Sequence, residues 1–187
     1  LLPQPSLAGL ITGIGTIALP GTWTGSIGPV GASANVSPNN DNVAIASPNV
    51  VPYSIFFNSP GGLDVEFVVD ASAATTEYRF TQWLVNKSGV PWAGFLFELG
   101  FGLGSQFVAA SPAGGLDFDT PERDPAPTSP TLPFILHTET TLTWSGGVVP
   151  SIGTAQLAFA VDVPDNLQNV NPSGSNRFKL RQTPNLV

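Results

Sequence analysis

Few side chains in this sequence could carry acid–base catalysis. His137 is the single histidine, so a Ser-His-Asp triad would have to use it, yet no Gly-x-Ser-x-Gly turn is present to hold a nucleophile. Asp64 and Glu66 are two residues apart and would share one face of a strand, as a carboxylate pair for glycoside hydrolysis or as an ordinary solvated face. We therefore expect a protein that is not an enzyme.

Carboxylates are concentrated between residues 117 and 124. Asp117, Asp119 and Asp124 offer oxygen ligands of the kind that Ca²⁺ accepts in flexible loops. The spacing is not that of an EF-hand, and Arg123 could instead pair with one of the aspartates. Cysteine is absent, which excludes zinc–thiolate and iron–sulfur sites. We therefore expect no cofactor, with calcium as the alternative that this cluster leaves open.

Four tryptophans could supply faces on which sugar rings stack: Trp23, Trp83, Trp92 and Trp144. Tryptophan is also a common core residue, and the alternative is that most of them anchor the core or its turns. A monomeric, surface-anchored carbohydrate-binding module is therefore the alternative function.

The scarcity of charge limits the possible partners. Charged residues make up 10% of the 187 positions, with 6 bases against 13 acids and a net charge of −7. Such a balance argues against nucleic-acid binding. The absence of Cys and Met suits an oxidising exterior. A surface with few charges belongs either to a secreted β-domain or to a subunit that is covered in an assembly.

The first 20 residues form an uncharged segment that is apolar on both faces. Its glycines disfavour a helix, and it has neither the basic start of a signal peptide nor the composition of a membrane span. We expect an extended strand that is buried in its own domain or in a neighbour. One face would carry Leu7, Ile11, Ile17 and Leu19, and the other Leu10 and Ile14.

Half of the bases lie near the end of the sequence, at alternate positions. Arg177, Lys179 and Arg181 would line one face of a strand. The strand is interpreted either as an edge strand that positive charge protects from aggregation, or as a surface that meets acidic groups of a neighbouring subunit or of an anionic polysaccharide.

Alternating hydrophobic residues predict a fold built from short strands. The pattern is clearest at residues 63–70 and 76–86 and is followed by a nearly apolar, central strand at 92–99. Further strands are predicted at residues 43–47, 52–58, 134–144, 155–162 and 176–182. The expected fold is all-β: a single-domain antiparallel β-sandwich or jelly roll over residues 21–187, preceded by the extended segment 1–20.

Several motifs between residues 76 and 182 resemble a known family. The stretches TEYRFTQWLVNKSGVPW (76–92), FLFELGFGLG (95–104) and GLDFDTPERDPAPT (115–128) are similar to bacterial choice-of-anchor extracellular domains, many of which end in a PEP-CTERM sorting signal. FKLRQTP (178–184) resembles the stretch that often precedes this signal. The resemblance implies export from a Gram-negative bacterium, a location at the cell surface or in the matrix, and association with exopolysaccharide. It implies no catalytic residues.

Together these patterns predict a structural protein of the bacterial surface or extracellular matrix. Copies of the chain would assemble into a filament when residues 7–19 of one copy complete the sheet of the next. Copies of itself and exopolysaccharide are the expected partners.

Overall fold

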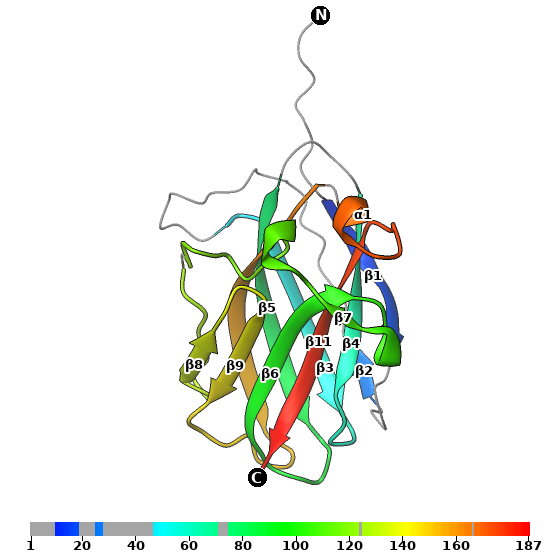
Figure 1. Cartoon of the computed structure of the whole chain (residues 1–187). Coiled ribbons are helices and arrows are strands. Elements are labelled where there is room, and N and C mark those ends of the chain that lie inside the picture. The colour runs from blue at the N-terminus through cyan, green and yellow to red at the C-terminus, as the bar shows by residue number, and fades with distance from the viewer. Residues whose placement is uncertain (1–9, 19–24, 28–46, 71–74, 124, 166) are drawn as a thin grey trace, which may run out of the picture.

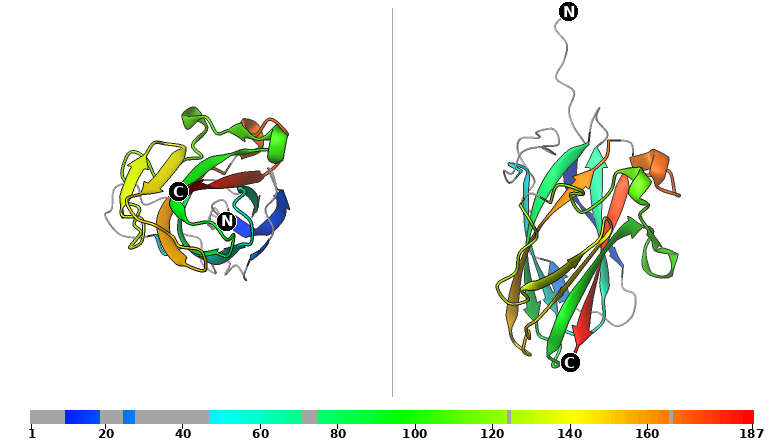
Figure 2. Two further views of the ribbon diagram at one scale, coloured as in Figure 1. Left: turned by 90° about the horizontal axis from the view of Figure 1, so that it is seen from below. Right: turned by 60° about the vertical axis from the view of Figure 1, so that its left-hand side comes forward.

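The chain folds into two β-sheets that face each other (Figures 1 and 2). The computed structural model describes residues 10–18, 25–27, 47–70, 75–123, 125–165 and 167–187. The first sheet, sheet A, contains in spatial order β1 (Leu10–Ala18), β4 (Leu63–Asp70), β11 (Arg177–Leu186), β6 (Trp92–Phe101), β9 (Thr141–Ser145) and β8 (Phe134–His137), and β7 (Val108–Ala109) also pairs with β6. Sheet B contains β10 (Thr154–Val163), β5 (Thr76–Asn86), β3 (Val50–Phe57) and β2 (Gly25–Ile27). The predicted all-β sandwich is confirmed.

Helical turns are short and lie outside the sheets. They are η1 (Gly104–Gln106), η2 (Pro112–Gly114) and α1 (Leu167–Val170).

Two details of the strands differ from the expected pattern. The β3–β5 pair of sheet B is parallel, because β4, which lies between them in sequence, crosses to sheet A. The single strand predicted at residues 134–144 is two strands, β8 and β9. The Thr138 hydroxyl accepts a hydrogen bond from the N–H of Thr141, which closes the turn between them.

The core lies between the sheets and is rich in aromatic rings. Strand β4 turns Val65, Phe67 and Val69 inward, as its alternation predicted. Phe67 packs edge-to-face on Phe80 of β5, with ring centroids 5.2 Å apart. Stacked and edge-to-face ring pairs of this kind contribute beyond the apolar area that they bury. Edge-to-face contacts between aromatic residues of both sheets connect the two sheets along the length of the sandwich.

A closed ring of hydrogen bonds also joins the two sheets inside the core. The Tyr53 hydroxyl donates to Gln82 Oε1 at 2.5 Å, and Gln82 Nε2 donates to Gln182 Oε1 at 2.5 Å. Gln182 Nε2 completes the ring by donating to Tyr53 Oη at 3.3 Å. All three side chains are buried. Burial raises the pKa of Tyr53 well above its ordinary value, so the ring stays neutral.

Strand β1 forms one edge of sheet A in the same chain. It runs antiparallel to β4, from Leu10 opposite Asp70 to Ala18 opposite Asp64. Two register shifts interrupt the pairing and place positions 11, 14 and 17 opposite the inward-facing Val69, Phe67 and Val65. The strict alternation predicted for this strand is therefore wrong, because each shift adds residues to β1 without a partner in β4.

The side chain of Ile11 is buried at the start of β1. Its backbone N–H donates to Tyr78 Oη of sheet B at 3.0 Å, so this point of β1 contacts both sheets. Five other residues of segment 1–20 are expected to line its two faces. The structure describes the backbone of Leu10, Ile14 and Ile17, whereas Leu7 and Leu19 lie outside the described residues.

A flap formed by residues 102–107 crosses the outer face of sheet A. Gly102 and Gly104 have φ angles of +74° and +56°, which favour glycine and turn the chain sharply after β6. Gly104 N–H donates to Asp64 Oδ2 at 2.7 Å, and the Arg181 guanidinium lies 3.9 Å from the centre of the Phe107 ring.

Candidate functional site

Three carboxylates meet on the outer face of sheet B. Glu77 of β5 and Asp162 of β10 are direct cross-strand partners, and Asp119 comes from the loop that follows η2. All three are buried, and one oxygen atom from each lies within 4.8 Å of the others. Backbone hydrogen bonds in both directions between Asp117 and Asp162 hold this loop against β10.

This cluster only partly matches the predicted calcium ligands. Asp119 belongs to it, whereas the Asp117 carboxylate accepts hydrogen bonds from the N–H and hydroxyl of Thr120 and so closes a local turn. Asp124 lies outside the described residues. Glu77 and Asp162 were missed because they belong to strands that are far apart in sequence. Three carboxylate oxygens at this separation are ligands of the type that Ca²⁺ prefers.

Calcium binding at this cluster stays a prediction. We expect millimolar CaCl₂ to raise the midpoint of thermal unfolding of the wild-type chain and to leave that of Asp119→Asn unchanged, because ion binding to the folded state alone stabilises it. MgCl₂ at equal ionic strength is the control for screening. Equal midpoints in CaCl₂ and in chelator would exclude calcium from the cluster.

His137 is placed as a structural residue of β8. Its Nε2 lies 2.8 Å from the carbonyl oxygen of Phe118, which can only accept, so Nε2 carries the proton. Burial, together with the positive charge of Arg123, lowers the pKa of His137 to about 4, against the smaller raising effect of the bond to Phe118. The imidazole is therefore neutral at neutral pH, and its described contacts serve the packing of β8.

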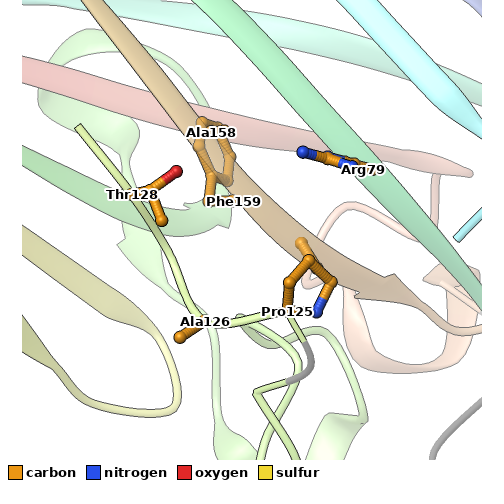
Figure 3. A pocket seen from close by; sticks show the side chains of 7 residues that line it. Arg79, Pro125, Ala126, Thr128, Ala158 and Phe159 are labelled. Carbon is orange, nitrogen blue, oxygen red and sulfur yellow. The ribbon is translucent and has the colours of Figure 1, made fainter. Parts of the chain in front are cut away.

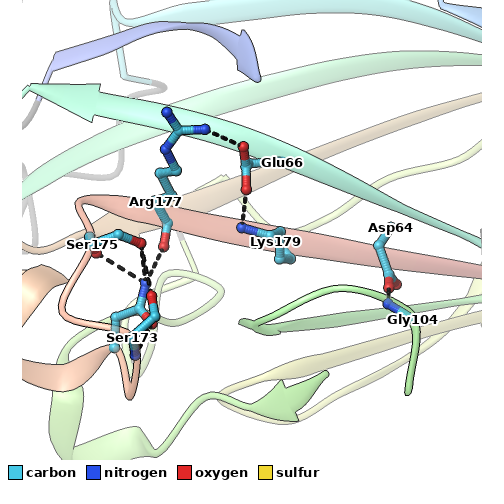
Figure 4. Close-up of polar contacts among 8 residues, drawn as sticks. Asp64, Glu66, Gly104, Ser173, Ser175, Arg177 and Lys179 are labelled. Carbon is cyan, nitrogen blue, oxygen red and sulfur yellow. Dashed lines mark hydrogen bonds and ion pairs between the residues drawn. The ribbon is translucent and has the colours of Figure 1, made fainter. Parts of the chain in front are cut away.

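A second charged cluster lies on the outer face of sheet A (Figure 4). Glu66 Oε1 forms an ion pair with Arg177 Nη1 at 2.5 Å, and Glu66 Oε2 forms a second ion pair with the ammonium of Lys179. Arg181 Nε lies 2.6 Å from Asp64 Oδ1. Asp64 and Glu66 are 0% and 5% exposed, so the solvated face predicted for them is wrong. Burial alone would raise the pKa of Glu66, but the hydrogen bonds from Lys179 and Arg177 outweigh it and lower the pKa.

The position of β11 corrects a further expectation. The strand carrying Arg177, Lys179 and Arg181 is not an edge strand, because it lies between β4 and β6. The three bases meet acids, as one interpretation held, but these acids belong to the same chain. Paired charge on two adjacent strands explains how a basic strand is accommodated inside the sheet.

The tryptophans separate into core and surface residues. Trp92 and Trp144 are fully buried, as expected for core anchors. Trp83 is 46% exposed on the outer face of β5. Trp23 lies outside the described residues.

The cavities near these clusters are small or shallow. One of about 50 Å³ lies between the outer face of sheet B and the segment from Pro125 to Thr128, and Arg79 lines it (Figure 3). Two others, of about 250 and 310 Å³, share Phe101 beside the flap and extend toward α1. Neither of these two is lined by a charged side chain.

Comparisons with protein-family models, with curated proteins and with solved structures gave no match for this chain. Within the described part of the chain, none of the helices has the length and apolar composition needed to span a membrane.

Proposed function

We propose that the protein is a non-enzymatic structural subunit of a bacterial cell surface or extracellular matrix, and that copies assemble by exchanging β1. One observation carries the proposal: β1 is an edge strand that pairs with β4 alone among the described strands. In the assembly, β1 of one copy lies beside β4 of the next. The same contacts then form between chains, so the exchange loses no pairing.

The composition and position of β1 support this exchange. Charged side chains, which commonly protect exposed edges, are absent from the first 40 residues. The two register shifts in the β1–β4 pairing also leave residues of β1 without a ladder partner, which lowers the cost of detaching the strand. The bases of β11 take no part, because they already contact acids of their own chain. Since one copy both gives and receives a strand, the linkage is heterologous and grows into a filament unless it closes into a ring.

A pair of introduced cysteines distinguishes exchange from pairing within one chain. Gly13 and Val68 are register partners, and a side chain at Gly13 would meet no atom within 4 Å. Opposite residues of antiparallel strands have the Cα separation that a disulfide needs. Because the natural chain contains no cysteine, Gly13→Cys/Val68→Cys has no competing thiol.

Oxidation of this variant in its assembled form is expected to give a ladder of covalent multimers on a denaturing, non-reducing gel. Gly13→Cys alone is the matched control and should give at most dimers. Assemblies that contain only internally cross-linked single chains would show that β1 stays in its own domain, and the proposal would be wrong.

A further inference from the structure

The outer face of sheet B presents an exposed aromatic residue between two polar neighbours. Trp83 of β5 is directly opposite Ser54 of β3 and Gln156 of β10. Ser54 and Gln156 are both partly exposed, so their polar groups lie beside the indole at the surface. An exposed indole can stack on a sugar ring, and a hydroxyl and an amide beside it can hydrogen-bond the hydroxyl groups of that sugar.

A cation lies at the same end of this face. Lys87 follows β5 directly and is exposed. Its ammonium lies 5.2 Å from the centre of the Phe56 ring, in a cation–π contact. Phe56 is the register partner of Val85 and therefore a diagonal neighbour of Trp83 on the same face. The aromatic rings and the ammonium thus form one continuous surface.

The acidic residues of this face lie at its other end. On the outward positions of β3, β5 and β10, the acids are Glu77 and Asp162, which are buried. Trp83 lies six positions along β5 from Glu77, about 20 Å. At physiological salt, charges that far apart at a surface are largely screened from each other. An anion at Trp83 would therefore be attracted by Lys87 and only weakly repelled by Glu77 and Asp162, although the whole chain carries a net charge of −7.

We propose that this face, formed by Ser54, Phe56, Trp83, Lys87 and Gln156, binds an acidic polysaccharide. A uronic acid ring would stack on Trp83 and place its carboxylate near Lys87, while Gln156 and Ser54 contact its hydroxyl groups. The site lies on sheet B, whereas strand exchange uses the β1 edge of sheet A. The two proposals therefore stand or fall separately.

Calorimetric titration of the monomeric protein with alginate oligosaccharides tests this site. We expect Trp83→Ala to weaken binding by more than about tenfold, because it removes the stacking surface. Lys87→Gln should weaken it by about fivefold at low salt and reduce its dependence on salt. Phe134→Ala is the matched control, since Phe134 is an exposed aromatic residue of β8 in sheet A.

Each arm of the experiment can overturn part of the proposal. Absence of heat with alginate and with polygalacturonate oligosaccharides, or equal affinities of Trp83→Ala and Phe134→Ala, would show that the face is not a saccharide site. Equal binding of neutral dextran oligosaccharides, with no effect of Lys87→Gln, would show that the ligand is not selected by its charge. Both Trp83 and Lys87 are exposed, so their replacement should leave the unfolding midpoint unchanged.

Discussion

Glu66→Ala is expected to lower the free energy of unfolding by about 3 to 5 kcal/mol, because it leaves the buried ammonium of Lys179 without its carboxylate. Lys179 is 4% exposed and belongs to β11, which lies between β4 and β6, so its ammonium is shielded from water where it pairs with Glu66. Arg177 is more exposed and can turn outward. The cost therefore arises mainly at Lys179.

Denaturant unfolding measures this effect. Glu139→Gln, which alters an exposed carboxylate, is the matched control and should change the stability by less than about 0.5 kcal/mol. Glu66→Ala/Lys179→Met should recover much of the loss, because an apolar pair needs no counter-charge. Equal stabilities of Glu66→Ala and Glu139→Gln would show that the ion pair contributes nothing.

The same ion pair predicts how stability depends on pH. Because the folded-state pKa of Glu66 is lowered from its ordinary value of 4.5, its contribution is fully present above that value. It is lost as the pH falls through the lower pKa of the folded state. Wild-type protein should therefore lose stability on acidification below about pH 5 more steeply than Glu66→Gln, which has no carboxylate to protonate. Parallel curves for the two proteins would contradict this account.

Gln82→Leu is expected to lower the free energy of unfolding by about 2 to 4 kcal/mol. It removes the buried acceptor of the Tyr53 hydroxyl proton and the buried donor to the side-chain oxygen of Gln182. The ring is closed, so its members should act as a unit. Gln82→Leu/Gln182→Leu should cost less than the sum of the single replacements. Adding Tyr53→Phe should remove the last orphaned group and recover further stability.

Chemical denaturation of this series gives the coupling between the three side chains. Gln168→Leu, an equivalent replacement on the exposed surface of α1, is the control for the change of side chain itself. Additive losses of stability across the series would show that the hydrogen bonds act independently. If Gln82→Leu lowered the stability no more than Gln168→Leu, the ring would be dispensable.

The sequence predicts those elements whose pattern is local. Alternation in LDVEFVVD places β4 with its inward face correctly, and the apolar run from Trp92 places β6 in the interior of sheet A. The position of a strand within its sheet depends on strands that are far away in the sequence. The charges of β11 suggest an edge strand when the strand is considered alone, and only the opposing acids of β4 explain its central place.

The candidate sites likewise combine features that a local pattern reveals with features that depend on distant strands. The loop containing Asp119 is visible as a run of acids, but its partners Glu77 and Asp162 come from β5 and β10, so their meeting depends on strand register. The four tryptophans are also alike in sequence. Burial separates Trp92 and Trp144 from Trp83, and burial depends on which face of each strand is turned to the opposite sheet.

The ion pair between Arg177 and Glu66 joins residues 111 positions apart. Because β11 lies between β4 and β6, sheet A cannot close until this distant segment has been synthesised. Until then, β4 and β6 each expose an unpaired edge on a ribosome-bound chain. Large loops must also close before these contacts form, which slows folding. The unfinished sandwich, with its unpaired strand edges, is therefore the state most open to aggregation.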